Sequence, residues 1–297
     1  MKGTGRMART RRIKLAGRDA IYHIMSRTAG RQMLLADAGV KRDMIRALER
    51  SAEFSGVEVL GFALMNNHFH LVVRIPSPEE PVSEQEVLRR YAVLVGKAKA
   101  GELESRLAHM REHGDSHSVD IILDRMRSRM YDLSQFGKTF KETFGRIFRR
   151  RRPWCGNLWE GRFKSTLIGE AEYLRICTAY VELNPVRAGL STSSSGYEWC
   201  TTGAAERGNA FAQRCRERLA AVAGFGDSPR SEGWLMKRAP QISCGKIFGS
   251  GEFVAESLGL LADRVKSRTA RPRRIKGGEG FSSHGHLLAA KIERKAA

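Results

Sequence analysis

Two histidines inside an apolar run are the first residues of this chain that could do chemistry. His68 and His70 stand in the stretch "NNHFHLVV", residues 66–73, with one phenylalanine between them. Side chains two apart in a strand point to the same face, so both imidazoles project side by side, about 7 Å apart along the backbone. Two neutral imidazoles placed in this way either converge on one divalent ion or are ordinary histidines on an exposed sheet face.

A second pair of reactive residues occurs in "YVELNPV". Tyr180 and Asn184 are four apart, so they share one face of a helix. The amide oxygen of Asn184 is a candidate third metal ligand, and a tyrosine phenolate is an oxygen nucleophile that can form a reversible ester with phosphorus. The pKa of a free phenol is about 10, so a metal that polarises the phosphate would assist the attack. The alternative for Tyr180 alone is a half-buried helix tyrosine with a hydrogen-bonded hydroxyl.

The charge of the chain indicates a polyanionic partner. The 297 residues include 52 Lys and Arg against 32 Asp and Glu, a formal net charge of +20. Lys and Arg that neutralise phosphates release condensed counterions, so nucleic acid is the simplest partner. The sequence has no apolar run near 18 residues and therefore no expected membrane span. Five cysteines without a CxxC pair predict neither a zinc knuckle nor a disulfide framework, and they fit a reducing cytoplasm.

Hydrophobic periodicity predicts the elements that must position these side chains. The expected order up to residue 190 is β-α-β-β-α-β-α, with a hairpin turn at the two asparagines before His68. This order predicts an α+β fold, a ferredoxin-like antiparallel sheet with helices on one face. The helix that carries Tyr180 should stop near Asn184, because the residue before a proline is pushed out of helical geometry. The strands are expected within 18–27, 57–65, 68–75 and 156–169, and the helices within 41–56, 119–148 and 170–190, with a helical, polar stretch before 117.

Composition divides the chain into three expected regions. Residues 1–15 form a basic N-terminal arm, which either lies along phosphates or is a solvated tail. Residues 16–202 form the main domain, and residues 203–297 form a C-terminal extension. Within that extension we expect helices at 209–223 and 251–268, followed by about 30 weakly ordered residues.

Three segments together resemble a known family. "NNHFHLVV", "GNLWEGRFKS" and "YVELNPVRAGL" are similar to motifs of the IS200-like single-tyrosine (HUH) transposases, and more closely of their REP-associated branch, over roughly residues 16–202. The first asparagine of the turn departs from the proline that is frequent in the family. The resemblance implies that His68, His70 and Asn184 bind the catalytic metal and that Tyr180 is the nucleophile. The family's Trp-containing segment is matched by Leu158, Trp159, Arg162 and Phe163.

The resemblance also implies a reaction and partners. The expected activity is cleavage and rejoining of single-stranded, hairpin-containing DNA through a 5′-phosphotyrosine intermediate, with Mg²⁺ or Mn²⁺ as the divalent cofactor. Each step exchanges one phosphodiester for another, so the absence of a GxxxxGK[ST] nucleotide loop is consistent with it. The implied location is the bacterial cytoplasm, in association with the nucleoid, and the implied state is a monomer or homodimer.

Basic residues interleaved with aromatic ones predict the DNA-binding surface. Aromatic rings stack unpaired bases while neighbouring cations follow the backbone. The alternative is that the tryptophans belong to the core and that only the cations are exposed. The predicted DNA-binding residues are Arg146, Arg149, Arg150, Arg151, Arg152, Trp154, Arg162 and Lys164.

Three other functions compete with strand transfer. A non-catalytic DNA-binding regulator or domesticated copy would need the basic surface but neither Tyr180 nor the histidine pair. A metal-dependent nuclease would use an activated water and leave Tyr180 structural. An RNA-binding ferredoxin-like module would carry aromatic residues where "HFHLVVRI" has histidines, which argues against it. A metal site at His113 and His117 is disfavoured by the helix-breaking Gly114 between them.

Overall fold

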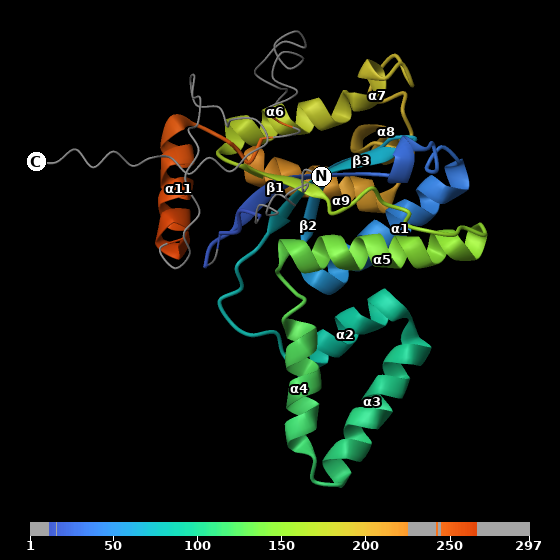
Figure 1. Ribbon diagram of the computed structural model, residues 1–297, viewed down its shortest axis with the longest axis vertical. Helices are drawn as coiled ribbons and strands as arrows, with labels where there is room; N and C mark the ends of the chain where they lie inside the picture. Colours follow the sequence, from blue (N-terminus) through green and yellow to red (C-terminus); the bar gives the residue numbers. More distant parts are fainter. Residues whose placement is uncertain (1–11, 16, 225–241, 243–244, 266–297) are drawn as a thin grey trace, which may run out of the picture.

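The chain folds around one mixed sheet with helices on both sides of it (Figure 1). The structure, a computed structural model, describes residues 12–15, 17–224, 242 and 245–265. The elements are β1 (Ala20–Arg27), η1 (Ala29–Arg31), α1 (Ala38–Ser55), β2 (Glu58–Leu64), β3 (His68–Ile75), α2 (Glu84–Val95), α3 (Lys97–Glu112), α4 (Ser116–Arg127), α5 (Leu133–Arg151), β4 (Lys164–Ile168), α6 (Ala171–Glu182), α7 (Asn184–Arg187), α8 (Thr201–Glu206), α9 (Ala210–Ala223), β5 (Ile247–Phe248) and α11 (Gly251–Val265).

The sheet has the strand order β2-β3-β1-β4-β5. The pairs β2–β3, β3–β1 and β1–β4 are antiparallel, and β5 adds to β4 in parallel. The first four strands have the ferredoxin-like order that the sequence predicts, and the α+β class is confirmed. The β3 range His68–Ile75 agrees with the prediction residue for residue.

Helices cover both faces of the sheet, which differs from the expected single face. Side chains alternate along β3: the ring of Phe69 lies 5.3 Å from Phe140 of α5, whereas the ring of His70 lies 5.8 Å from Tyr180 of α6. α5 and α6 therefore lie on opposite sides of the strands, as Figure 1 also shows. The physical reason is that both faces of β2 and β3 are apolar and buried, so each needs its own cover.

The single helix predicted over residues 119–148 is wrong. The chain leaves α4 at Arg127 and begins α5 at Leu133. Between them Tyr131 adopts a φ of 51°, and the Asp132 carboxylate accepts hydrogen bonds from the N–H groups of Ser134 and Gln135. An aspartate that caps two free N–H groups starts a new helix, although the apolar spacing continues across the break.

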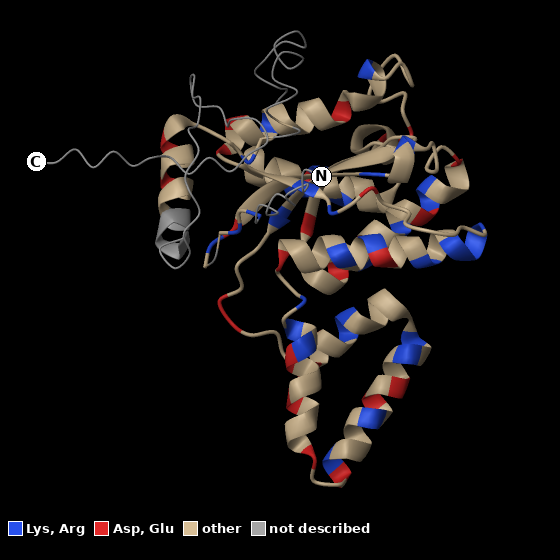
Figure 2. Cartoon of the chain, in the orientation of Figure 1, with Lys and Arg blue, Asp and Glu red and all other residues tan. Residues whose placement is uncertain are grey.

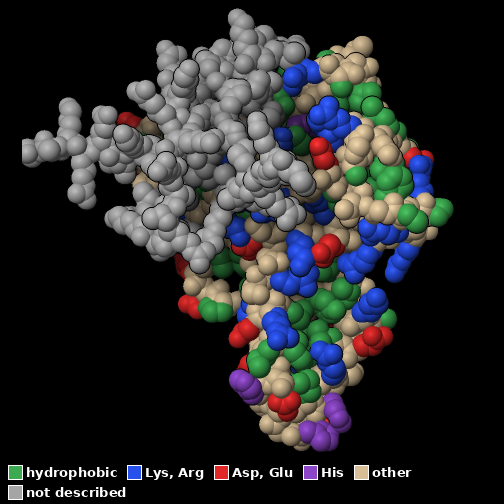
Figure 3. Space-filling model, in the orientation of Figure 1, with side chains coloured by type: hydrophobic (Ala, Val, Ile, Leu, Met, Phe, Trp, Pro, Cys, Tyr) green, Lys and Arg blue, Asp and Glu red, His purple; other side chains and the backbone are tan. Residues whose placement is uncertain are grey.

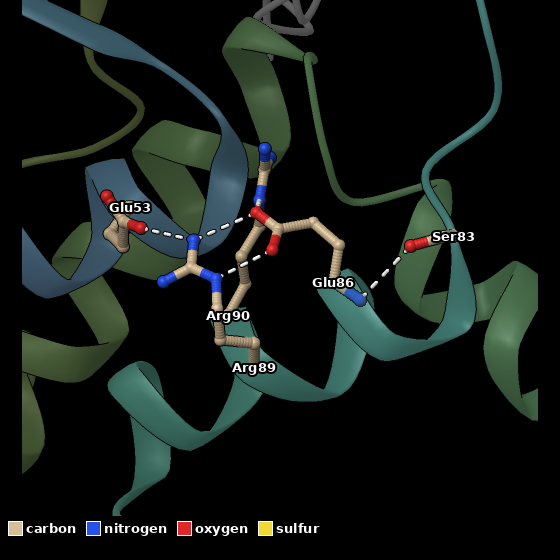
Figure 4. Close-up of polar contacts among 5 residues, drawn as sticks. All are labelled: Glu53, Ser83, Glu86, Arg89 and Arg90. Carbon is tan, nitrogen blue, oxygen red and sulfur yellow. Dashed lines mark hydrogen bonds and ion pairs between the residues drawn. The ribbon is translucent and has the colours of Figure 1, made fainter.

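Helices α2, α3 and α4 form an insertion between β3 and α5 that projects away from the sheet (Figure 1). Its apolar side chains form a second, smaller cluster that includes Phe54 of α1. Polar contacts tie the start of α2 to α1 (Figure 4). Ser83 caps the helix by accepting from Glu86 N at 3.3 Å, and Arg89 bridges Glu86 and Glu53, each at 2.6 Å. The insertion is thus anchored to the main body through α1.

Residues beyond position 202 take part in the main core. Phe211 of α9 stacks on Phe62 of β2 with ring centroids 6.1 Å apart, and Thr201 Oγ1 accepts from Phe62 N at 2.7 Å. Segments on both sides of the predicted 202/203 boundary therefore share one core, and the boundary itself stays a prediction. The predicted helices at 209–223 and 251–268 correspond to α9 and α11.

The described part of the N-terminal arm is packed rather than extended into solvent. Ile13 is buried, Arg12 donates to Phe163 O at 3.1 Å, and Lys14 pairs with Asp132 at 2.5 Å. The rest of the predicted arm, residues 1–11, and the predicted weakly ordered end lie outside the described residues. Among the described helices, none is both long and apolar enough to cross a membrane.

Candidate active site

The turn before the histidine pair is held by the end of β1. The carbonyl of Asn67 accepts from Thr28 N at 2.9 Å and from Thr28 Oγ1 at 3.0 Å. Asn67 Nδ2 donates to Arg31 O at 2.9 Å, which leaves its Oδ1 facing His68 Nδ1 at 2.7 Å. Because that oxygen can only accept, Nδ1 of His68 carries the proton and Nε2 keeps its lone pair. The turn thus fixes both the position and the tautomer of His68.

A third histidine joins the pair on the same face of the sheet. His23 of β1 pairs across from Val72 of β3, two residues from His70. Its Nε2 lies 2.9 Å from His70 Nδ1, and its Nδ1 lies 2.9 Å from the carbonyl oxygen of Ile242. The rings of His68 and His70 approach to 5.1 Å between centroids.

Tyr180 packs edge-on against this histidine cluster. Its ring centroid lies 5.8 Å from His70 and 6.0 Å from His23, with interplanar angles of 88° and 86°. The guanidinium carbon of Arg187, from α7, lies 5.1 Å from the centre of the Tyr180 ring. The side chain is 5% exposed. One chain therefore brings the predicted nucleophile into contact with His70, one of the two histidines predicted to bind metal.

Asn184 follows Tyr180 by one helical turn and is also buried. Its Nδ2 donates to the carbonyl oxygen of Tyr180 at 2.8 Å. A carbonyl only accepts, so this bond fixes the amide orientation and leaves Oδ1 for another partner. α6 ends at Glu182, close to the stop that the following Pro185 predicts, and the short α7 begins at Asn184.

The predicted metal ligands fit, by the chemistry of their atoms, a divalent ion that keeps part of its hydration shell. The described residues contain no cluster of three or more His, Cys, Asp and Glu side chains arranged for a metal. The atoms that the predicted ligands leave free are Nε2 of His68, an imidazole nitrogen of His70 and Oδ1 of Asn184, and convergence of Asn184 with the two histidines stays a prediction. Such a mixed set suits Mn²⁺ and accepts Mg²⁺ or Zn²⁺ when water or a phosphate oxygen fills the other positions.

Burial keeps the three imidazoles neutral. It lowers the pKa of His23 to about 4, and burial together with the nearby cation Arg27 lowers the pKa of His68 to about 4. The pKa of His70 is held well below its ordinary value by burial and then by its two histidine neighbours. Neutral imidazoles have the lone pairs that metal ligation requires.

A basic groove of about 560 Å³ lies between α5 and the segment 157–163. Lys141 Nζ donates to Gly161 O at 2.5 Å and lies 5.2 Å from the centre of the Trp159 ring. Burial lowers the pKa of Lys141 to about 8. The cations that line the groove are Arg12, Lys138, Lys141, Arg149 and Arg162. Figure 2 marks Lys and Arg positions along α5 and at its C-terminal end, and Figure 3 shows Lys and Arg side chains exposed on this face of the molecule.

The groove wall continues to the histidine pair. Arg27, the last residue of β1, pairs across from His68, and Glu160 N donates to Arg27 O at 2.9 Å. Trp159 forms a β-bridge with Thr28. The middle of the segment that lines the groove is therefore joined by backbone contacts to the end of β1, where Arg27 pairs across from the first candidate ligand.

Part of the chain is similar to a known protein family. The model of the family described as "Transposase IS200 like" matches residues 17–109. Over these residues, about a third of its length, the chain is similar to the IS200-like transposases. The matched part runs from β1 into α3 and contains His23, His68 and His70, whereas Tyr180 and Asn184 lie beyond it.

Likeness to individual proteins is limited. No curated protein matches this chain. Among solved structures, it is similar to one described as the structure of a REP-associated tyrosine transposase bound to a REP hairpin. The identity is 15% and the TM-score 0.43, with 76% of this chain and 96% of that chain covered.

The predicted DNA-binding arginines divide into two groups. Arg151 pairs with Asp43 at 2.7 Å and Arg152 pairs with Asp37 at 3.5 Å, so both turn toward α1. The reason is that consecutive helix residues rotate by about 100° each, which separates a run of four around the axis. The predicted residues that are exposed and take part in no ion pair within the described chain are Arg146, Arg149, Arg150, Arg162 and Lys164.

The two tryptophans are more buried than a free stacking platform would be. The Trp159 ring packs on Phe69 and Phe144, with centroids 5.4 and 5.9 Å away, as the core alternative predicts. Trp154 is half-buried against Phe148. Neither indole N–H has a hydrogen-bond partner among the described residues. A DNA-stacking role for Trp154 stays a prediction.

Sequence reasoning missed His23, Arg12, Lys138 and Lys141. The closeness of His23 to His70 depends on the β1–β3 register, which one sequence does not give. The one available signal was the alternation of side chains along "AIYHIMSR", which places His23 on a defined face of its strand. Arg12 and Lys141 meet only through tertiary packing, at positions separated by 129 residues of chain.

Proposed function

We propose that this IS200-like chain cleaves and rejoins single-stranded, hairpin-containing DNA through a covalent bond to Tyr180, in the manner of the REP-associated branch that its motifs resemble. The observation that carries the proposal is the contact of the Tyr180 ring with His70 across two separate elements. A tyrosine that only filled the core would need neither a metal-binding pair nor a cation beside it.

His68, His70 and Asn184 are proposed to hold one Mg²⁺ or Mn²⁺ ion. When bound, the ion would polarise the scissile phosphate and offset its negative charge. Support comes from the hydrogen bonds of His68 and Asn184, which engage the other polar atom of each side chain and orient the remaining lone pair outward. The protein's own contribution is a fixed, neutral ligand set on one strand, β3, and one helix, α7.

The proposed first step is attack of the Tyr180 phenolate oxygen on the phosphorus. The new bond joins this oxygen to phosphorus, the bond from phosphorus to the 3′ oxygen breaks, and the leaving oxygen takes up a proton to become a 3′-hydroxyl. Arg187, 5.1 Å from the ring, would stabilise the negative charge of the phenolate. A second 3′-hydroxyl then attacks the 5′-phosphotyrosine and restores the tyrosine, so no nucleotide energy source is consumed.

The basic groove is proposed to bind the single strand. Its cations would contact phosphates, and its wall at Trp159 and Phe163 offers apolar surface for bases. Glu160 of the groove wall is hydrogen-bonded to Arg27, which pairs across from His68, so the strand would pass around this end of β1 from the α5 face to the site. The proposed domain for this chemistry is residues 16–202, with monomer or homodimer as the functional state.

A covalent-adduct assay tests the function. Purified protein is incubated with a pool of 5′- and 3′-labelled hairpin oligonucleotides from DNA that flanks its gene, with Mg²⁺ or Mn²⁺, and analysed on a denaturing gel. Wild type should give a shifted, metal-dependent species. Tyr180→Phe should give none, because it removes the attacking oxygen and keeps the ring. Tyr173→Phe, on the same helix, is the matched control and should retain the adduct.

The other outcomes separate the competing functions. Cleavage without an adduct that survives Tyr180→Phe would identify a hydrolytic nuclease. Binding of a hairpin without cleavage under either metal would identify a DNA-binding regulator.

A further inference from the structure

The C-terminal segment reaches the histidine cluster through one carbonyl. Ile242 O lies 2.9 Å from His23 Nδ1, and His23 Nε2 lies 2.9 Å from His70 Nδ1. The two imidazole planes are parallel to within 2°. His23 and His70 are 1% and 3% exposed, so water does not compete for these bonds. A continuous line of hydrogen bonds therefore joins residue 242 to the proposed metal ligand.

The direction of each bond follows from the first one. A carbonyl oxygen only accepts, so His23 Nδ1 carries the proton. A neutral imidazole carries one proton, so His23 Nε2 must accept. His70 Nδ1 must then donate, which leaves a bare lone pair on His70 Nε2. The carbonyl of Ile242 thus determines, two rings away, which nitrogen of His70 is free.

The carbonyl is itself held against the sheet. Thr166 Oγ1 of β4 lies 3.2 Å from Ile242 O and 2.7 Å from Gly245 O. β5 pairs in parallel with β4, and Leu167 N donates to Lys246 O at 2.8 Å. Several hydrogen bonds therefore hold Ile242 and residues 245–248 against β4, the strand that pairs with β1 beside His23.

We propose that His23 is a positioning residue that fixes the Nδ1–H tautomer of His70 and so presents Nε2 to the metal, with the Ile242 carbonyl as its anchor. This inference rests on the proposed function, in which His70 is a ligand. It gives the C-terminal extension a role in the site. Both nitrogens of His23 are occupied, so His23 is not itself a ligand. Partners that orient a ligating histidine typically change metal affinity about 10–100-fold when removed.

The tautomer is tested first in the unmodified protein. Long-range ¹H–¹⁵N correlation spectra of ¹⁵N-histidine-labelled, metal-free protein at pH 7 distinguish a protonated Nδ1 from a protonated Nε2. His70 is assigned from the signals lost in His70→Gln. The expected result is Nδ1–H for His70 and for His23. Nε2–H at His70 overturns the proposal, and this measurement does not depend on the folding of any His23 variant.

Mn²⁺ affinity, measured by the loss of the free-ion EPR signal, tests the consequence. His23→Phe keeps a ring but removes both hydrogen bonds, and it should weaken Mn²⁺ binding about 10–100-fold. His23→Gln can donate to Ile242 O and accept from His70 Nδ1, so it should restore most of the affinity. His113→Phe, at an exposed histidine on the insertion, is the control and should bind like wild type.

The outcomes separate this inference from the function on which it rests. Equal Mn²⁺ binding by wild type and His68→Ala would overturn the metal site and the inference together. Binding that depends on His68 but is unchanged in His23→Phe would overturn the inference alone. If His23→Gln has the circular dichroism of wild type but binds Mn²⁺ no better than His23→Phe, the inference is also contradicted. That result would mean that His23 acts through packing, because the restored hydrogen bonds would then give no gain in affinity.

Discussion

At the scale of single residues, the site depends on which polar atoms are already engaged. His68, His70 and Asn184 were predictable from sequence as residue types at the right spacing, but their free atoms were not. Those atoms are set by the Asn67 side chain, by His23 and by the Tyr180 carbonyl. Asn67 is next to His68 in the sequence and Tyr180 is one helical turn before Asn184, whereas His23 is 47 residues from His70 and its contact depends on the fold.

Lys141 makes a prediction about pH at this scale. Its pKa of about 8 means that it is charged at pH 7 and neutral at pH 9. A neutral amine attracts phosphate weakly, so single-stranded DNA affinity should fall several-fold between these pH values at constant ionic strength. The stability effect has the opposite sign: the unfolded chain binds the extra proton between about pH 8 and 10.5, so this group favours folding as the pH rises.

Fluorescence anisotropy with a labelled single strand measures the pH effect. Lys141→Arg stays charged throughout and should give a flatter profile. Lys138→Arg, at an exposed groove lysine one turn away, is the matched control and should follow wild type. Identical pH profiles for wild type and Lys141→Arg would rule out a contribution from Lys141.

At the scale of elements, helix breaks were harder to predict than strands. The apolar spacing of residues 119–148 continues through Tyr131, so periodicity alone joined α4 to α5. The capping aspartate at position 132 was the local signal for the break. The strand β3 was predictable because both its ends are marked, by an asparagine turn and by a proline at position 76.

The close approach of α5 and the segment 157–163 makes a second prediction. A Cβ on Gly137 would lie 2.1 Å from Phe163 Cε1, so Gly137→Ala must displace the ring that forms the groove wall. Overpacking of this kind costs about 1–3 kcal/mol. Urea unfolding should show this loss, and DNA affinity should fall because the groove is distorted.

Gly145 on the same helix provides the comparison. A Cβ there would meet Arg149 Nη1 at 3.5 Å, an ordinary contact. Gly145→Ala should therefore be neutral or stabilise by up to about 1 kcal/mol, since alanine favours a helix over glycine. Equal stability of the two alanine variants would contradict the packing described for Phe163.

At the scale of the whole molecule, the proposed active site and the proposed DNA-binding groove lie on opposite faces of the sheet. The histidines and Tyr180 lie on the α6 side, whereas the basic groove lies along α5 on the other. The net charge of +20 predicted a polyanion, but not which side of a two-sided sheet would carry the groove. The sequence also could not place the C-terminal segment, because a two-residue parallel strand such as β5 has no readable pattern.

A mixing experiment tests whether one molecule makes a complete site. Tyr180 and His70 of the same chain are in contact, so a mixture of His68→Ala and Tyr180→Phe proteins should form no covalent adduct. Adduct in the mixture, absent from each variant alone, would instead mean that two chains exchange the tyrosine helix. Wild type diluted with either variant controls for inhibition by the inactive partner.

The most direct test of the central claim is to locate the covalent bond. The adduct formed with a hairpin oligonucleotide and Mn²⁺ is digested with nuclease and protease, and the peptides are sequenced by tandem mass spectrometry. The account predicts a nucleotide joined through its 5′-phosphate to Tyr180, together with a free 3′-hydroxyl on the released strand. A nucleotide on another residue, or cleaved DNA with free 5′-phosphates and an unmodified Tyr180, would contradict it.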